Sequence, residues 1–94
     1  MFSIIIPTLN NLKYLKFCIN SIKKNSLKNH EILVHVSEDE YNSTRTYLES
    51  QNIKYTYSSN NVGLCTAINT ITKHSTNDYL IYCHDDMYFC PNWE

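Results

Sequence analysis

The stretch FSIIIPTLNNLKYLKFCINSI, residues 2–22, combines the two patterns that decide the fold of this chain. Its first five residues are rich in β-branched side chains and stop at Pro7, which is typical of a short buried strand. After the turn, apolar residues recur at spacings of three, four and three, so they share one face of a helix. Asn10 or Asn11 is expected to cap the start of this helix. The stretch therefore predicts a strand, a polar turn and a helix over residues 10–25.

The same alternation of strand and helix patterns continues along the chain. Strands are predicted in the runs EILVHV, IKYTY and DYLIYC, which are residues 31–36, 53–57 and 78–83. Helices are predicted over residues 41–50, with Asn42 or Ser43 as a possible cap, and over residues 61–74. The order β-α-β-α-β-α-β favours right-handed crossovers and a parallel sheet covered on both faces. We therefore predict an α/β fold, a three-layer sandwich with a four-stranded parallel, Rossmann-like sheet, in a single domain over residues 1–94.

Length and composition limit the kinds of protein that this chain can be. Its 94 residues suffice for one small domain, and the sequence is 43% hydrophobic and 18% charged with a net charge of −1. This charge gives no reason to expect nucleic acid as a partner. No run reaches the roughly 20 apolar residues that span a membrane, and the N-terminus does not resemble a signal peptide. We expect a cytoplasmic protein with reduced cysteines, with peripheral contact to a membrane left open.

Polar segments follow every predicted strand, and they locate a candidate site. In open parallel sheets, ligands bind in the crevice outside the carboxyl ends of the strands. The segments at these ends are residues 7–10, 37–40, 58–61 and 84–86. Two of these segments are acidic, and gathered carboxylates repel each other unless a cation or a ligand rich in hydrogen-bond donors joins them. The sequence therefore predicts a binding site at this edge of the sheet.

Asp85 and Asp86 are adjacent carboxylates directly after the last predicted strand. Carboxylate oxygens suit Mg²⁺ or Mn²⁺, and Mg²⁺ sites commonly combine one or two carboxylates with the phosphates of a substrate. Because side chains alternate along a strand, we expect one carboxylate to reach a metal while the other contacts ligand or braces the loop. The alternative is that the pair only ends the strand and caps the following turn.

Four motifs in this order resemble the nucleotide-binding half of the family 2 glycosyltransferases, which have the GT-A fold. SIIIPTLN resembles the opening strand of the family, and EILVHVSEDE resembles its second strand. The sequence Asn61-Val62-Gly63 resembles the start of its third helix, where Asn69 matches a second asparagine. HDDM, residues 84–87, matches the position of the DXD motif after the fourth strand. The resemblance extends over essentially all of the chain.

The resemblance implies a metal-dependent glycosyltransferase that takes its sugar from a nucleotide-sugar, with a UDP-sugar favoured, and that inverts the sugar configuration. It implies Asp86 as the ligand of Mn²⁺ or Mg²⁺, while Asp85 contacts the ribose or the sugar. His84 is a second candidate ligand, although a non-ligating role at the strand end is preferred. Further donor-binding residues are expected to be Pro7, Thr8, Asn10, Ser37, Asp39, Asn61, Gly63 and Asn69. The acceptor, a glycan, a lipid or a protein, is not specified.

The chain departs from the family pattern in two places. The second strand of the family usually ends in a pair of aspartates that bind base or ribose, and here these positions hold Val36 and Ser37. Asp39 or a neighbouring glutamate is expected to substitute for them. The acceptor half and the usual catalytic base follow the fourth strand in the family, whereas this sequence ends at Glu94, which is not expected to be the base. The base therefore stays unknown, and we expect a missing C-terminal half or a partner chain to supply it.

Other interpretations are open at this stage. One is a nucleotide- or metal-binding module without catalysis, which needs a partner chain for the acceptor site. A regulatory domain of the phospho-receiver type also has acidic strand ends, but the lysine that it needs after a later strand is not found. Cys83, His84 and Cys90 offer soft zinc ligands at a spacing that matches no structural zinc site. His35 and His74 are interpreted as side chains of a strand and of a helix end.

Overall fold

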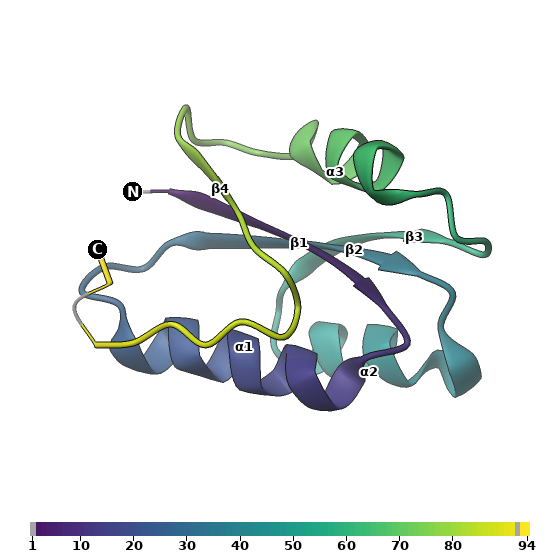
Figure 1. Cartoon of the computed structure of the whole chain (residues 1–94), viewed down its shortest axis with the longest axis horizontal. Helices are drawn as coiled ribbons and strands as arrows, with labels where there is room; N and C mark the ends of the chain where they lie inside the picture. Colours follow the sequence, from purple (N-terminus) through teal and green to yellow (C-terminus); the bar gives the residue numbers. More distant parts are fainter. Residues whose placement is uncertain (1, 92) are drawn as a thin grey trace.

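A computed structural model describes residues 2–91 and 93–94 of the chain. Strands and helices alternate along it in the order that the sequence predicts (Figure 1). The strands are β1 (Ser3–Leu9), β2 (Glu31–Ser37), β3 (Lys54–Ser58) and β4 (Leu80–Tyr82). The helices are α1 (Leu12–Asn25), α2 (Ser43–Ser50) and α3 (Leu64–Thr72), and a 3₁₀ turn, η1 (Glu40–Asn42), precedes α2. No helix in this part of the chain is long and apolar enough to cross a lipid bilayer.

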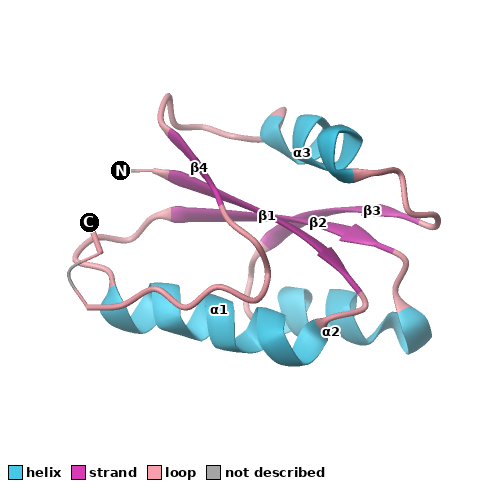
Figure 2. Cartoon of the chain, in the orientation of Figure 1, coloured by secondary structure: helices cyan, strands magenta, loops and turns pink. Residues whose placement is uncertain are grey.

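The four strands form one parallel sheet in the order β3-β2-β1-β4. Helices α1 and α2 cover one face of this sheet and α3 covers the other, as Figure 2 shows. The predicted α/β fold, with a four-stranded parallel sheet between two helical layers, is therefore confirmed. Because the strand order reverses between β1 and β4, a ligand crevice is expected at the carboxyl ends of these two strands.

The central strand β1 contributes to two cores because successive side chains of a strand point to opposite faces. Ile4 and Ile6 belong to the larger core under α1 and α2, whereas Ile5 belongs to the smaller core under α3. The larger core also holds the packed face of α1, which consists of Leu15, Cys18, Ile19 and Ile22. The smaller core contains Leu33 of β2 and Ile71 of α3. Burial of each large apolar side chain stabilises the fold by about 1.5–3 kcal/mol.

Pro7 does not end β1, contrary to the prediction, and the strand continues to Leu9. The backbone groups of Ser3 and Ile5 bond to β4 and to the residues beside it. Residues of a parallel strand bond alternately to its two neighbours, so the nitrogen of Pro7 also faces the β4 side. Because β4 pairs with β1 only as far as Tyr82 opposite Ile5, the missing N–H of Pro7 removes no bond from the sheet.

Both β4 and α3 are shorter in the structure than the sequence predicts. β4 forms only at Leu80–Tyr82 instead of residues 78–83, and the loop before it takes part in a polar network at the amino ends of the strands. α3 begins at Leu64 instead of residue 61, because Asn61 and Gly63 form a turn at its start. Both differences lengthen the polar segments at the ends of the elements.

The segment after β4, residues 83–91, runs back along α1 (Figure 1). Phe89 is buried in the larger core. Its N–H donates to Ser21 Oγ (2.9 Å), and Asn25 Nδ2 donates to its carbonyl (2.6 Å), so α1 binds this segment through two side chains. The packing of Phe89 therefore fixes the polar turn that lies between it and β4.

Glu94, the last residue of the chain, forms hydrogen bonds near the amino end of β2. Its carboxylate accepts the N–H of Leu27 and is bonded to His30 Nε2. The N–H of Phe2 donates to His30 Nδ1 (3.0 Å), so the proton of a neutral ring lies on Nε2 and faces Glu94. These contacts give Glu94 a structural role at the end of the sheet opposite to the acidic turn.

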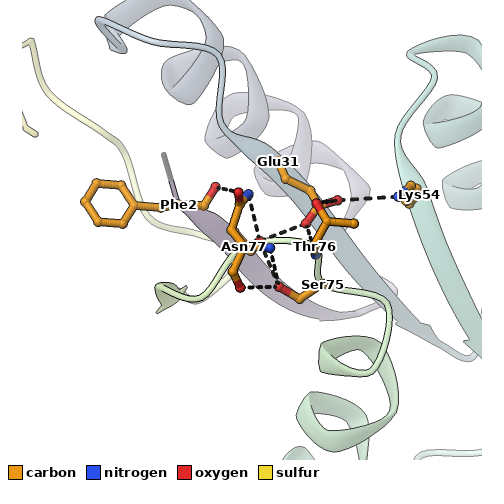
Figure 3. Close-up of polar contacts among 7 residues, drawn as sticks. Phe2, Glu31, Lys54, Ser75, Thr76 and Asn77 are labelled. Atoms are coloured by element: carbon orange, nitrogen blue, oxygen red, sulfur yellow. Dashed lines mark hydrogen bonds and ion pairs between the residues drawn. The ribbon is translucent and has the colours of Figure 1, made fainter.

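A polar network at the amino ends of the strands holds the loop between α3 and β4 (Figure 3). The Glu31 carboxylate accepts hydrogen bonds from Ser3 Oγ (2.7 Å) and from the N and Oγ1 of Thr76 (2.9 and 3.1 Å). Lys54 Nζ lies 3.4 Å from it, and Asn77 Nδ2 donates to Ser3 Oγ (3.2 Å). Burial alone raises the pKa of Glu31, but these hydrogen bonds outweigh it and lower the pKa below its usual value.

We predict that Glu31→Gln lowers the free energy of unfolding at neutral pH by about 1–3 kcal/mol, because the hydrogen bonds to a charged acceptor are weakened. A lowered pKa in the folded state contributes stability above the unfolded pKa and loses it as the pH falls through the folded pKa. The difference between variant and wild type should therefore shrink in acid. Urea unfolding at a series of pH values measures it.

Glu38→Gln is the matched control, because it makes the same change at an exposed position. This variant should stay within about 0.5 kcal/mol of wild type at every pH. An equal decrease in the free energy of unfolding in Glu31→Gln and Glu38→Gln would contradict the structural role given to Glu31.

Candidate functional site

A cavity of about 370 Å³ opens at the carboxyl ends of β1, β2 and β4, beside the start of α3. The predicted site residues that line it are Pro7, Thr8, Ser37, Asn61, Gly63, His84 and Asp85. Its wall is completed by residues that the sequence did not single out as site residues: Leu9, Asn11, Leu64 and Ala67. The structure therefore brings most of the predicted residues together at the edge that the parallel topology indicates.

Asp85 is held in the wall of the cavity by two side chains from the other end of the sequence. Thr8 Oγ1 donates to Asp85 Oδ2 (2.7 Å), and Asn11 Nδ2 donates to Asp85 Oδ1 (3.1 Å). Thr8 is the last buried residue of β1, and Asn11 directly precedes α1. Because each carboxylate oxygen accepts one bond, Asp85 is fixed in orientation and keeps lone pairs for a ligand.

Asn11 has a role that differs from the predicted one. Asn11 stands at the cap position, but its side chain makes no cap hydrogen bond to α1, and its backbone has φ −131° and ψ 41°. Asn10, the other candidate cap, has a left-handed backbone with φ 46°. The prediction of an asparagine cap was therefore wrong, since the Asn11 amide bonds to Asp85 instead. Its place directly after a strand end was a signal that it could belong to the site.

Asp86 lies in a tight turn next to Asp85 but points elsewhere. The N–H of Met87 donates to the carbonyl of His84 (3.2 Å), which closes a turn over the two aspartates. Asp86 is exposed and does not line the cavity. Within residues 2–91 and 93–94, no hydrogen bond or ion pair to its carboxylate is found. One aspartate is therefore fixed in the wall and the other is accessible beside it.

His84 is exposed on the cavity side of the same turn. Its Nδ1 lies 3.1 Å from the hydroxyl of Tyr82, and the two rings meet edge to face with centroids 5.1 Å apart. This contact occupies one ring nitrogen and leaves Nε2 accessible. The non-ligating role preferred for His84 on the sequence and a ligand role through Nε2 both stay predictions.

The donor set at this turn fits a hard cation that takes further oxygen ligands from a phosphate. An exposed carboxylate and a neighbouring imidazole provide one or two protein ligands, which is the usual number for Mg²⁺ bound with substrate phosphates. The residues that the structure describes contain no group of three or more His, Cys, Asp or Glu placed to hold a metal ion by themselves. Among the same described residues, Cys83, His84 and Cys90 therefore do not form a closed zinc site, and Cys83 is buried in the core.

The start of α3 forms the other side of the cavity. Asn61 Oδ1 accepts the N–H of Gly63 (3.0 Å), and Gly63 has φ 86° and ψ 159°, a conformation that other residues rarely adopt. α3 therefore begins abruptly at Leu64, and no side chain of the described residues caps it. The first N–H groups of a helix attract anions, so this end of α3 suits a phosphate.

Asp39 has a structural role that the sequence did not predict. Its carboxylate accepts the N–H groups of Thr44 and Arg45 (both 3.0 Å) and pairs with Arg45 Nε (2.9 Å), so it caps α2. Its side chain is 0% exposed and does not line the cavity. Burial raises the pKa of Asp39, but these donors outweigh burial and lower it. The cap predicted at Asn42 or Ser43 was wrong, because Asp39 reaches the helix start from beyond η1.

Two other predicted residues also lie away from the cavity. Asn10 is exposed and lines a separate hollow of about 210 Å³ beside Tyr41 and Thr44. Asn69 is exposed on α3, two residues after Ala67, so helix geometry turns it away from the face that meets the cavity. In this structure neither residue is placed to contact a ligand in the cavity, and their donor-binding roles stay predictions.

Comparison with known proteins agrees with this architecture. Residues 3–93 match the model of the family described as Glycosyl transferase family 2. An uncharacterized glycosyltransferase of Rickettsia conorii is 37% identical over 94 residues, which cover 96% of this chain and 15% of that protein. The chain thus spans about one seventh of the length of this curated relative.

Two solved structures have similar folds. The structure of TarS residues 1–349 from S. aureus matches with a TM-score of 0.79 and 22% identity, over 93% of this chain and 28% of that one. The mannosyltransferase PcManGT from Pyrobaculum calidifontis, in complex with GDP-Man and Mn²⁺, matches with a TM-score of 0.78 and 18% identity, over 90% of this chain and 27% of that one. At these low sequence identities, the two structures show only that the fold is similar. The family model matches nearly the whole chain, and this chain therefore belongs to glycosyl transferase family 2.

Proposed function

We propose that this chain binds a nucleotide-sugar together with Mn²⁺ or Mg²⁺ and forms the donor-binding part of a glycosyltransferase. The observation that carries the proposal is the turn at the cavity, with Asp85 fixed in the wall and Asp86 exposed beside it. Similar folds are described in complex with UDP and with GDP-Man and Mn²⁺, which supports this class of ligand. A UDP-sugar is the favoured donor.

Asp85 is proposed to accept hydrogen bonds from hydroxyl groups of the donor. Thr8 and Asn11 each occupy one side of the carboxylate, which fixes its orientation before a ligand arrives. An acceptor whose orientation is already fixed loses little conformational entropy when a ligand binds, so its hydrogen bonds contribute more to affinity. The ribose or the sugar of the donor would lie against this wall of the cavity.

The diphosphate is proposed to lie between Asp86 and the start of α3. The uncapped N–H groups of α3 offer hydrogen bonds and the positive end of the helix dipole to a phosphate. Asp86, with His84 as a second candidate, would hold the divalent ion. When bound, this ion neutralises the negative charge that develops on the diphosphate as the bond to the sugar breaks.

The acceptor and the catalytic base are proposed to come from outside these residues. Asp85 is the only carboxylate in the cavity wall within the described ranges, and Thr8 and Asn11 occupy it. The chain spans only 15–28% of the proteins it matches, which leaves room in them for a second binding surface. An inverting transfer to a glycan, lipid or protein stays part of the proposal. The same observation favours the second candidate, a nucleotide-binding module that needs a partner chain for the acceptor site.

We predict that Asp86→Asn weakens the binding of a nucleotide-sugar in the presence of Mn²⁺ by at least about tenfold, because the metal loses a charged ligand. Calorimetric titration with UDP-, GDP- and dTDP-sugars, with Mn²⁺ and with EDTA, measures this effect. In EDTA the variant and the wild type should bind alike. Asp78→Asn is the matched control, since Asp78 is exposed at the amino end of β4.

The absence of binding to any of these donors by the wild-type chain would overturn the proposed function. Binding without transfer or hydrolysis of the sugar would favour the non-catalytic module. Loss of sugar hydrolysis in Asp86→Asn, with the fold intact, would favour the enzyme.

Asp39 and Asp85 should respond oppositely to replacement by alanine. We predict that Asp39→Ala lowers the free energy of unfolding by about 1–3 kcal/mol, because it leaves the start of α2 without its cap, and changes donor affinity by less than about twofold. Asp85→Ala should weaken donor binding by about tenfold or more. Urea unfolding and calorimetry at a temperature where both variants are folded separate the two roles. A tenfold loss of affinity in folded Asp39→Ala would instead support the donor contact predicted from the sequence.

A further inference from the structure

Met87 closes the turn that carries the two aspartates through both its backbone and its side chain. Its N–H donates to the carbonyl oxygen of His84 (3.2 Å), which is the hydrogen bond of a β-turn with Asp85 and Asp86 in the middle. In the opposite direction, the N–H of His84 donates to Met87 Sδ (3.3 Å). The side chain of Met87 therefore folds back to the start of the turn, and two hydrogen bonds close the turn.

The sulfur of Met87 accepts an N–H group that the sheet cannot use. The preceding N–H, that of Cys83, donates to the carbonyl oxygen of Ile5 in β1 (3.0 Å). Successive N–H groups of an extended chain point to opposite sides, and β4 is an edge strand, so the N–H of His84 has no strand beside it. Among the described residues, no acceptor for this N–H other than the sulfur is found. The thioether is therefore its partner in the folded chain.

Packing in the core does not explain the position of the Met87 side chain. This side chain is 42% exposed and belongs to neither of the two cores. A methionine side chain has three rotatable bonds and loses much rotamer freedom when it is fixed, so a folded conformation at an exposed position needs a contact that holds it. The contact found here is the hydrogen bond from His84. Because a thioether is a weak acceptor, the effect of this contact is expected to be modest.

The two hydrogen bonds of Met87 act on the part of the chain that holds Asp86. Before Asp86, the carboxylate of Asp85 is held by two hydrogen bonds in the cavity wall. After it, Met87 is bonded to His84. The backbone of Asp86 lies between these fixed residues, whereas its own carboxylate is exposed. Met87 itself does not line the cavity, so the loss of its sulfur would loosen the backbone of Asp86 and remove no group from the cavity wall.

We propose that Met87 is a positioning residue for the carboxylate of Asp86: its sulfur, by accepting the N–H of His84, holds the turn closed in the conformation that binds the divalent ion. This inference rests on the proposed function, in which Asp86 holds Mn²⁺ or Mg²⁺. A ligand whose backbone is already ordered loses less conformational entropy when the ion binds. Sulfur is a soft ligand that suits neither ion, so Met87 acts through the turn and not by a direct bond to the metal.

The test exchanges the sulfur alone. The chain contains two methionines, Met1 and Met87, and norleucine incorporated in place of methionine replaces each sulfur by a methylene group of similar size. In the presence of UDP or GDP, whichever binds more tightly, we expect the norleucine chain to bind Mn²⁺ about threefold more weakly than wild type. Electron paramagnetic resonance of the free ion measures this affinity. Binding of the nucleotide in EDTA should be unchanged.

Two substitutions separate the acceptor from the shape of the side chain. Met87→Leu should weaken Mn²⁺ binding as norleucine does, and norleucine in the Met87→Leu chain, which changes Met1 alone, should have no further effect. Met87→Gln places an amide oxygen within reach of the N–H of His84 and should restore the affinity to within about twofold of wild type. Equal losses in Met87→Leu and Met87→Gln overturn the inference. Urea unfolding confirms that each chain is folded at the temperature of the measurement.

The hydrogen bond to the sulfur also has a readout that needs neither metal nor nucleotide. In NMR spectra of the nitrogen-labelled chain, the amide proton of His84 should exchange with solvent about threefold more slowly in the wild type than in the norleucine chain. Equal exchange rates overturn the inference. Mn²⁺ affinity that norleucine leaves unchanged, in a wild type that binds the nucleotide with Mn²⁺, overturns this inference alone. Failure of the wild type to bind either nucleotide overturns the proposed function and this inference with it.

Discussion

The pairing of β1 with β2 on one side and β4 on the other is the constraint on which the rest of the structure depends. β1 is buried on both faces, and like its neighbour β2 it has apolar residues in both cores and a strand on each edge. Its parallel register places the carboxyl ends of the three strands together at one edge. Residues as distant in sequence as Thr8 and Asp85 meet there as a direct result.

The turn that carries the two aspartates owes its shape to contacts on both sides of it. Before the turn, β4 is short and pairs only with the first part of β1. After the turn, Phe89 is buried against α1 and bonded to Ser21 and Asn25. At the turn itself, Thr8 and Asn11 hold Asp85. A short polar segment without much packing of its own is thus positioned by strand pairing, core burial and two side-chain hydrogen bonds together.

The order of elements and the edge that carries the site could be predicted from the sequence because both follow from local periodicity and from the rules of parallel sheets. The role of Asp39 could not. Glu38, Tyr41 and Asn42 have left-handed backbones, and this unusual path turns Asp39 back toward α2. Positive φ angles at residues other than glycine are uncommon and have no clear sequence signal. The continuation of β1 through Pro7 was not predicted either, because it depends on where β4 stops pairing with β1.

Asp39, Asp85 and Asp86, at the edge of the sheet, differ in how the chain compensates their negative charge. This difference supports the different roles proposed for the three aspartates. The charge of Asp39 is met by two backbone N–H groups and Arg45, and that of Asp85 by a hydroxyl and an amide. Asp86 has neither kind of partner among the described residues and remains exposed. A carboxylate that already accepts hydrogen bonds from the protein must lose some of them when it binds a cation. A carboxylate that is only hydrated loses only water molecules. The aspartate that is least integrated into the fold is therefore the one that a metal ion can bind at the lowest cost to stability.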